Sequence, residues 1–228
     1  MKKTQHLKKD LKATNKEVFT ELTENATFVD LKHLKRNDVL ICDKQSNYTR
    51  LIISGVALRR LYNTKQLTID LDVIDAYHFV DLENLYNSIL FEGELKALTD
   101  IYYYDISRKE IEPFLKKYPE FLYQNMQYTT YISFNYRKIN LLSVYERIIF
   151  ILIEISLQYA TEKNGEIFLP KFISQKLLAS LTNTSISATR KILVELMTQN
   201  IIRLTPKPIC IYDFTYLLQR SSFHELSK

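Results

Sequence analysis

The chain has 228 residues, of which 46% are hydrophobic and 25% charged, so it can form one large globular domain or two small ones. Its three glycines, Gly55, Gly93 and Gly165, lie far apart. A Walker loop and a GxGxxG motif both need clustered glycines, so the sequence excludes the common nucleotide-binding enzymes of these kinds. The net charge is +5, but residues 70–112 carry 3 basic and 11 acidic side chains, whereas residues 161–228 carry 9 basic and 5 acidic ones. This contrast indicates two modules with different functions.

The two cysteines, Cys42 and Cys210, form neither a metal-binding CxxC pattern nor a disulfide framework, as expected for a reduced, intracellular protein. The first 19 residues contain no apolar signal-peptide core. The longest apolar run, residues 148–153, is far shorter than the roughly 20 residues that span a bilayer. The expected location is therefore the cytoplasm, without a membrane partner.

Helical spacing of apolar residues predicts a helix over residues 1–24. Between residues 26 and 107, short runs rich in β-branched and aromatic residues alternate with turn-forming clusters, which predicts antiparallel strands at Val39–Cys42, Leu51–Ser54, Ala57–Tyr62, Gln66–Ile74 and Ile101–Ile106. Gly55 is expected in a turn or bulge that needs a positive φ.

The fourth of these runs alternates apolar and polar residues, and we expect its apolar face, with Leu67, Ile69, Leu71 and Val73, to be buried. Its carboxylates Asp70 and Asp72, and Asp75 beyond them, could suggest a metal site. Alternating carboxylates on one strand are more often solvent-facing, and no loop that could cage a cation with oxygen ligands follows. The sequence therefore predicts exposed carboxylates and no metal site.

The segment after this region favours two helices. Pro113 is expected to mark the edge of an element, and Pro119 to begin a long helix. Apolar and small polar residues recur at spacings of three and four, which fits either the pairing of two helices or packing against the β-region of the same chain; they are Leu122, Asn125, Thr129, Ile132, Tyr136 and Ile139. The next helix, Leu142–Tyr159, is apolar on most faces and should be buried.

Residues 171–214 contain two short predicted helices joined by a turn. Ser174 and Ser185 are candidate N-caps, and Asn183 suits a left-handed turn residue. The second helix runs from Ile186 to about Gln199, with its inward positions at Ile192, Leu193 and Leu196. Two helices joined in this way are typical of a helix-turn-helix. Two apolar runs around the turn at residues 205–208 predict a β-hairpin behind it.

The run from Ile173 to Leu193, ISQKLLASLTNTSISATRKIL, resembles the DNA-binding domain of the Crp/Fnr superfamily of transcription regulators. Residues 34–41 and 51–57 resemble the first strands and the glycine-containing turn of that family's β-roll, and the order of elements extends the resemblance over about residues 30–215. It implies an α+β chain with an antiparallel β-roll at residues 1–118, a dimerisation helix at 119–140 and a winged helix-turn-helix at 141–228.

The same resemblance implies a homodimer that binds an inverted repeat of double-stranded DNA, and contacts RNA polymerase if it is an activator. Its dimerisation residues would be Leu122, Thr129, Ile132, Tyr136 and Ile139. Ile186, Ser187 and Lys191 match base-contacting positions, Ser185 matches a phosphate-contacting one, and Arg190 lies beside them. Further phosphate contacts are expected from Lys176 and Lys207, and less from the strand residue Arg203.

Two departures from the family pattern concern specificity and the effector. Many members carry Arg-Glu where this chain has Ile186 and Ser187; Ile186 offers only an apolar contact, for instance to a thymine methyl, so we expect an A·T-rich operator. Residues 73–83 correspond to the cyclic-nucleotide phosphate motif but contain no glycine or arginine, and they contain the carboxylates Asp75, Asp81 and Glu83. Cyclic AMP binding is therefore not expected.

No other sensor or catalytic pattern is found. There is no cysteine cluster before Cys42, which we interpret as an ordinary strand residue rather than a redox switch, and His78 as an ordinary histidine rather than a haem ligand. The scattered histidines form no HExxH motif or triad, so no enzyme and no cofactor are predicted. The alternative hypothesis is a protein-interaction module in which the winged helix binds a partner protein.

Overall fold

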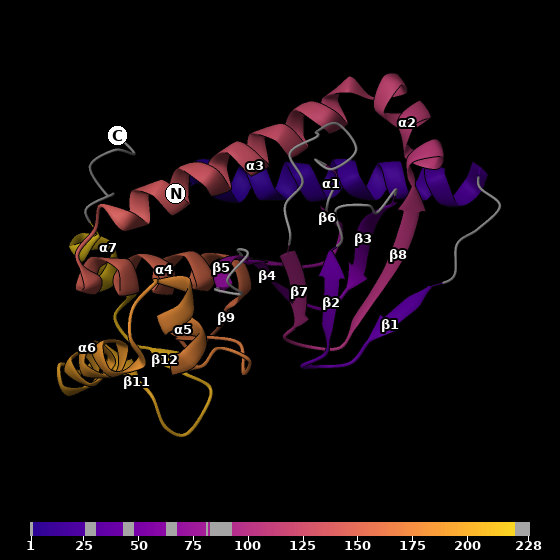
Figure 1. The fold of residues 1–228 in the computed structure, drawn as a ribbon. Coiled ribbons are helices and arrows are strands. Elements are labelled where there is room, and N and C mark those ends of the chain that lie inside the picture. The colour runs from indigo at the N-terminus through magenta and orange to yellow at the C-terminus, as the bar shows by residue number, and fades with distance from the viewer. Residues whose placement is uncertain are drawn as a thin grey trace. The chain divides into compact units, whose positions relative to one another are not determined.

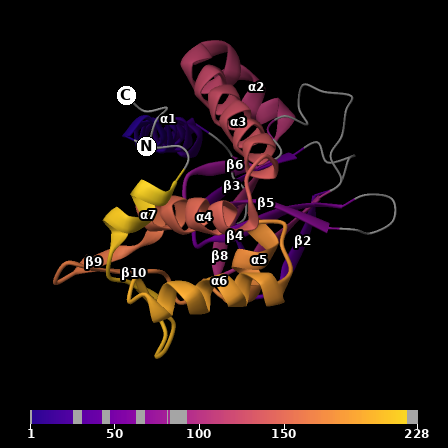
Figure 2. The same cartoon turned by 90° about the vertical axis from the view of Figure 1, so that its left-hand side faces the viewer.

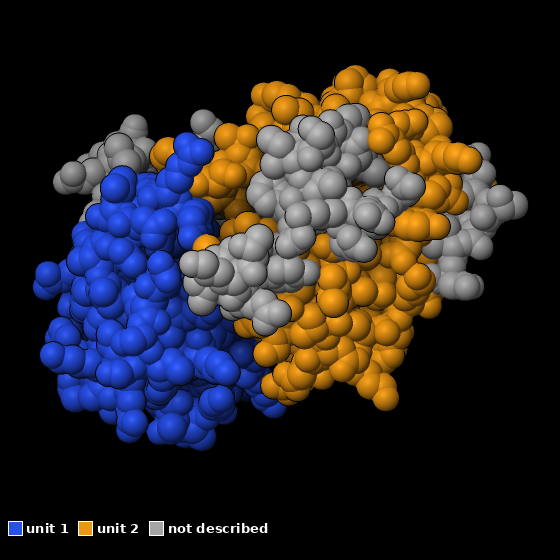
Figure 3. All heavy atoms as spheres, viewed as in Figure 1, with its two compact units in different colours: residues 1, 135–228 blue, residues 2–134 orange. Residues whose placement is uncertain are grey.

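The computed structural model describes residues 2–25, 31–42, 48–62, 68–80, 82 and 93–221. The chain forms two compact units, residues 2–134 and residues 135–228 (Figure 3). Each is considered by itself below. Together they confirm an α+β fold, with antiparallel sheets in the N-terminal part and seven helices among the described residues (Figure 1).

The unit of residues 2–134 contains two four-stranded antiparallel sheets. One has the order β1 (Lys32–Leu34), β8 (Ile101–Ser107), β3 (Tyr48–Ser54), β6 (His78–Val80). The other has the order β2 (Val39–Cys42), β7 (Gly93–Ala97), β4 (Ala57–Tyr62), β5 (Thr68–Ile74). The chain passes back and forth between the two sheets, which makes a β-roll, as predicted. The sequence did not predict β1, β6 and β7, because these short strands lack the run of four apolar residues that marks the equally short β2.

Gly55 occupies the sharp turn between β3 and β4 with a φ of +96°. A Cβ added there would lie 2.2 Å from the carbonyl oxygen of Asp100. Only glycine combines a positive φ with so close a backbone approach, so the prediction for this position is confirmed.

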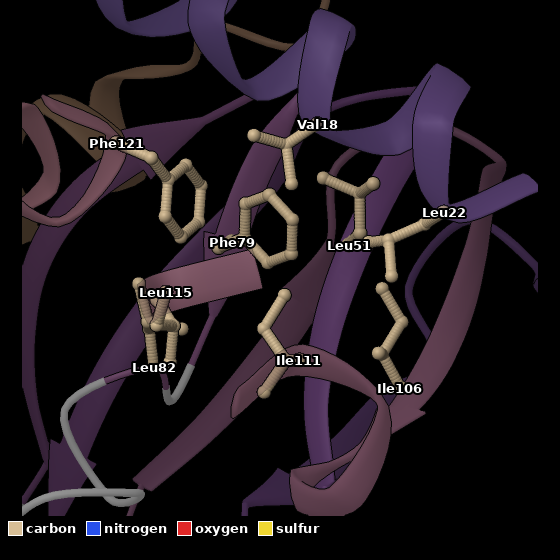
Figure 4. Packing of buried hydrophobic residues seen from close by; sticks show 9 residues of the cluster. All are labelled: Val18, Leu22, Leu51, Phe79, Leu82, Ile106, Ile111, Leu115 and Phe121. Atoms are coloured by element: carbon tan, nitrogen blue, oxygen red, sulfur yellow. The ribbon is translucent and has the colours of Figure 1, made fainter. Parts of the chain in front are cut away.

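Two apolar clusters stabilise the roll. One joins residues of both sheets, among them Ile52, Ile74, Leu95 and Ile101. The other packs helices against the β1-β8-β3-β6 sheet; its members are Val18, Leu22, Leu51, Phe79, Leu82, Ile106, Ile111, Leu115 and Phe121 (Figure 4). Burying one such side chain contributes roughly 1.5–3 kcal/mol, so these clusters fix the helices onto the sheet.

Three helices cover this sheet: α1 (Lys2–Asn25), α2 (Arg108–Lys117) and α3 (Pro119–Asn140). The predicted helix at residues 1–24 and the start of a helix at Pro119 are confirmed. The expectation for Pro113 is wrong, because Pro113 lies inside α2. A capping box fixes the start of α2: the Ser107 hydroxyl accepts from the Glu110 N–H and the Glu110 carboxylate accepts from the Ser107 N–H.

The unit of residues 135–228 contains α4 (Val144–Tyr159), α5 (Gln175–Leu181), α6 (Ile186–Thr198) and α7 (Phe214–Arg220) (Figure 2). A small antiparallel sheet has the order β11 (Ile202–Arg203), β12 (Cys210–Ile211), β10 (Glu166–Phe168), β9 (Thr161–Lys163). Helix α4 is buried on several faces, as predicted, and packs against α5, α6 and α7. The winged helix-turn-helix is thus present, with β11 and β12 as its hairpin. Within the described ranges, none of the helices combines the length and apolar content that crossing a bilayer requires.

Candidate nucleic-acid interface

The helix-turn-helix begins each of its helices on a serine cap. The Ser174 hydroxyl accepts from the Leu177 N–H at 3.1 Å, and the Ser185 hydroxyl accepts from the Ala188 N–H at 3.1 Å. Between the helices, Asn183 has a φ of 50°, the left-handed conformation that its side chain tolerates. Both predicted caps and the turn residue are confirmed, and they fix where α6 begins.

Threonine hydroxyls connect the turn to α6. The Thr182 hydroxyl donates to the Leu178 carbonyl at 2.7 Å, the Thr182 and Thr184 hydroxyl oxygens are 2.8 Å apart, and those of Thr184 and Thr189 are also 2.8 Å apart. A hydroxyl has one proton, so Thr184 donates to Thr182 and Thr189 donates to Thr184. Because Thr182 and Thr189 are fully buried, this chain of hydroxyls holds α6 firmly against the turn.

Helix α6 separates an inward face from an exposed one. Ile192, Leu193 and Leu196 are buried, as predicted. The predicted base-contacting residues Ile186, Ser187 and Lys191 are all exposed, as is Arg190 beside them, and their helical spacing places the four on one face. Ile186, the first residue of the helix, is 52% exposed.

The other candidate residues lie around α6 in the same unit. Lys176 is exposed in the first turn of α5, and Lys207 is exposed between β11 and β12. Ser185 is exposed, and its hydroxyl retains a proton to donate while it caps α6. Arg203 is only partly exposed and interacts with the Cys210 thiol, whose pKa is raised by burial and by the nearby Glu166 carboxylate. Arg203 therefore lies in a local strand contact.

Two residues of this surface, Lys171 and Val194, were not singled out from the sequence, and Asn183 was predicted only as a turn residue and not as a contact. Lys171 and Asn183 are exposed before α5 and in the turn, and Val194 is 38% exposed one turn after Arg190. The spacing of four from Arg190 to Val194 could have indicated that position, since it continues the same helix face. Lys171 carries no sequence signal that separates it from an ordinary loop residue, and the turn preference of Asn183 does not indicate a contact.

The cations of this surface differ from Arg59 and Arg60 of the roll, each of which lies against a carboxylate. In the described part of the chain, no carboxylate lies within 4.0 Å of the ammonium or guanidinium nitrogens of Lys176, Arg190, Lys191 or Lys207. Exposed cations without a carboxylate partner are available for an external anion. They lie on and around a helix that presents its side chains to solvent, which is the arrangement that contacts DNA phosphates and base edges.

The predicted dimerisation residues of α3 do not share one environment. Leu122 packs partly against the roll core and Ile139 is buried, whereas Thr129 is exposed. Ile132 and Tyr136 are partly exposed. The predicted seam therefore follows the border of the buried face of α3. The more exposed large apolar side chains of this helix are Tyr123, Met126 and Phe134.

Inside the roll, the expectation of exposed carboxylates is wrong. Asp70 is 5% and Asp72 is 9% exposed, while Ile69 is 45% exposed. Arg59 Nε lies 2.9 Å from Asp72 Oδ1, and Arg60 Nε lies 2.5 Å from Asp70 Oδ1. The two arginines occupy the neighbouring strand β4, so each carboxylate is buried against its own cation. Leu67 lies outside the described residues.

The buried pair of Arg59 and Asp72 also reaches α3. The Tyr128 hydroxyl donates to Asp72 Oδ2 at 3.0 Å, and the Tyr128 ring meets the His78 ring edge-on at a centroid distance of 4.7 Å. His78 is thus buried in an aromatic contact. Asp75 accepts from the Lys12 ammonium at 2.5 Å, while Asp81 and Glu83 lie outside the described residues. Among those described, no cluster of three metal-binding side chains is found.

No family model and no curated protein matches this sequence. Solved structures do match. A cyclic nucleotide-binding domain-containing protein of Listeria monocytogenes EGD-e is 19% identical, with a TM-score of 0.74 over 88% of this chain and 98% of that chain. A Crp/Fnr-family transcriptional regulator of Thermus thermophilus is 17% identical, with a TM-score of 0.67 over 83% and 97%. The c-di-GMP responsive global regulator CLP of Xanthomonas campestris is 17% identical, with a TM-score of 0.68 over 88% and 99%. The chain therefore has the fold of the Crp/Fnr transcription regulators, from the β-roll through the winged helix-turn-helix.

Proposed function

We propose that this protein is a sequence-specific transcription regulator that binds an inverted repeat of double-stranded DNA as a homodimer in the cytoplasm. The observation that carries the proposal is the exposed face of α6, where Arg190 and Lys191 have no carboxylate partner among the described residues. A fold can serve many functions, so this surface, more than the likeness to regulators, supports DNA binding.

The chemistry of α6 suggests how it reads DNA. Lys191 can donate to guanine O6 and N7 in the major groove, while Ile186 can contact a thymine methyl. Arg190 lies beside them and can reach a base or a phosphate. Ser185, Lys176 and Lys207 would hold the DNA backbone and so fix the register of α6 in the groove.

A dimer is proposed because two recognition helices about 34 Å apart would read two half-sites on one side of the duplex. Its seam would lie on α3. The predicted residues Leu122, Thr129, Ile132, Tyr136 and Ile139 border a more exposed apolar face formed by Tyr123, Met126 and Phe134, and both sets belong to the proposed interface. Contact with RNA polymerase would follow if the regulator is an activator.

A second function is favoured by one observation: α6 exposes apolar as well as basic side chains. Ile186, Val194 and Met197 are 52%, 38% and 37% exposed. Exposed apolar side chains on a helix can dock onto a partner protein. A winged helix that binds a protein would use this apolar part of α6.

The dependence of binding on salt distinguishes the two functions. DNA binding releases counterions, so the logarithm of the association constant should fall linearly as the logarithm of salt concentration rises, by about 0.9 for each phosphate contacted. Fluorescence anisotropy with a labelled random-sequence duplex measures this slope. We expect clear binding at low salt and a steep negative slope. Absence of binding at about 50 mM salt would contradict the DNA-binding function and favour the protein-interaction one.

A further inference from the structure

Arg147, in the first turns of α4, donates to backbone carbonyls of two separate segments. Its Nε donates to the Leu142 carbonyl at 2.9 Å, and its Nη2 donates to the carbonyl of Asn140, the last residue of α3, at 3.4 Å. All of these residues belong to the unit of residues 135–228. Arg147 therefore ties α4 to the end of α3.

The other side of the same guanidinium reaches the helix-turn-helix. Nη1 lies 3.4 Å from the carbonyl oxygens of both Thr182 and Asn183, at the end of α5. The carbonyl end of a helix carries a partial negative charge, which favours a cation there. A guanidinium presents five donors in a fixed fork, so it can serve both segments at once, whereas an ammonium is a single point charge.

From the turn, the contact continues into α6. Arg147 holds the backbone of Thr182, the Thr182 hydroxyl accepts from Thr184, and the Thr184 hydroxyl accepts from Thr189. Thr189 is fully buried and directly precedes Arg190 and Lys191 in α6. An unbroken series of polar contacts thus links the end of α3 to the start of the exposed face of α6.

We propose that Arg147 is a positioning residue that fixes the turn and α6 relative to the end of α3, so that Arg190 and Lys191 are held ready to read DNA. The DNA-reading part rests on the proposed function. The mechanical part, that Arg147 and Thr184 hold the turn in place, does not, because it concerns contacts within one unit.

Hydrogen exchange in the full chain tests the mechanical part. In Arg147→Met, amides of residues 182–189 should exchange about tenfold faster, because hydrogen bonds from a charged group are lost at that turn. Amides of residues 152–159 in α4 should be unchanged. Arg147→Lys should restore only part of the protection. Thr184→Val, which keeps the side-chain shape, should accelerate the same segment without touching Arg147, and Arg108→Met on α2 is the matched control.

Uniform acceleration over both segments in Arg147→Met would mean general destabilisation and would overturn the proposal, as would no acceleration at all.

A second experiment tests the DNA-reading part, with a duplex that the wild-type protein selects from a random library. Arg147→Met should bind it about tenfold more weakly, with less than about a twofold change for random-sequence duplex. Equal affinities of variant and wild type would overturn the positioning role. If the wild type binds neither duplex, the DNA function fails, and the exchange result still decides the mechanical part.

Discussion

The buried arginines of the roll and the exposed cations of α6 have different surroundings. In the roll, Arg59 and Arg60 are mostly buried and each lies against a carboxylate of the neighbouring strand. In the helix-turn-helix unit, Arg190 and Lys191 are exposed, with no carboxylate partner among the described residues. A buried cation needs a partner because an unpaired charge is costly in a low-dielectric interior, whereas an exposed one remains available to an external anion. The comparison separates charges that maintain the fold from charges that can bind.

The largest expected effect comes from breaking the buried ion pair of Arg59 and Asp72 in the roll. Asp72→Ala removes the carboxylate that neutralises Arg59 and accepts from Tyr128, and should lower the free energy of unfolding by about 3–5 kcal/mol. Urea denaturation measures this, with Glu112→Ala as the control, because its ion pair with Arg108 is exposed to solvent and should contribute little to stability. The double variant Arg59→Met/Asp72→Leu should recover much of the loss. Equal effects of Asp72→Ala and Glu112→Ala would contradict the structural role of the buried pair.

The next effect concerns base reading. Lys191→Ala should weaken binding to the selected operator by about 1–3 kcal/mol and relax specificity at the base it contacts, with a smaller change on random-sequence DNA. Competition gel shifts with both duplexes measure the difference. A matched control is Lys163→Ala, on the exposed strand β9 of the same unit. Equal losses on the two duplexes would show that Lys191 contacts only the backbone.

A smaller effect is expected from the residues assigned to phosphates. Lys176→Ala should weaken binding to all duplexes by a similar factor and make the salt slope shallower by about 1, because one fewer counterion is released. Anisotropy titrations at several salt concentrations give the slope. An unchanged slope would remove Lys176 from the interface and leave it as ordinary solvated surface.

The smallest effect is a pH dependence that involves no DNA. Burial, together with the Tyr216 hydroxyl, raises the pKa of Tyr145 to about 12. Because the pKa of Tyr145 is higher in the folded than in the unfolded state, its protonated hydroxyl stabilises the fold. This stabilisation is complete below about pH 10 and is lost as the pH rises towards about 12. Tyr145→Phe should therefore lose less stability than the wild type over that range in alkaline denaturation. Parallel curves for the two proteins would contradict a raised Tyr145 pKa.

Much of the fold could be predicted because its signals are local. The caps at Ser174 and Ser185, the left-handed Asn183 and the turn at Gly55 each depend on a few neighbouring residues, and the structure confirms them. Helix α2 was not predicted, because Pro113 indicated the edge of an element and the capping box at Ser107 and Glu110 did not enter the prediction. The rule that proline favours the first turn describes a preference, and α2 accommodates this proline in its interior.

The burial of Asp70 and Asp72 could not be predicted from their own strand. Alternation locates a face but does not say which face is inward, and the deciding residues, Arg59 and Arg60, lie on another strand. Which side chains of α3 are buried could not be predicted for a similar reason. Leu122 and Thr129 share a spacing in the sequence, yet one packs against the roll core and the other is exposed. Such differences depend on tertiary contacts that spacing alone does not contain.

The central claim is that α6 reads a specific DNA sequence as part of a homodimer. Selection of bound sequences from a random duplex library by the purified full chain tests it most directly. We expect enrichment of one inverted repeat, rich in A·T pairs, with half-site centres about one helical turn apart. Recovery of sequences no different from the starting library, by a protein that is folded and dimeric, would contradict it.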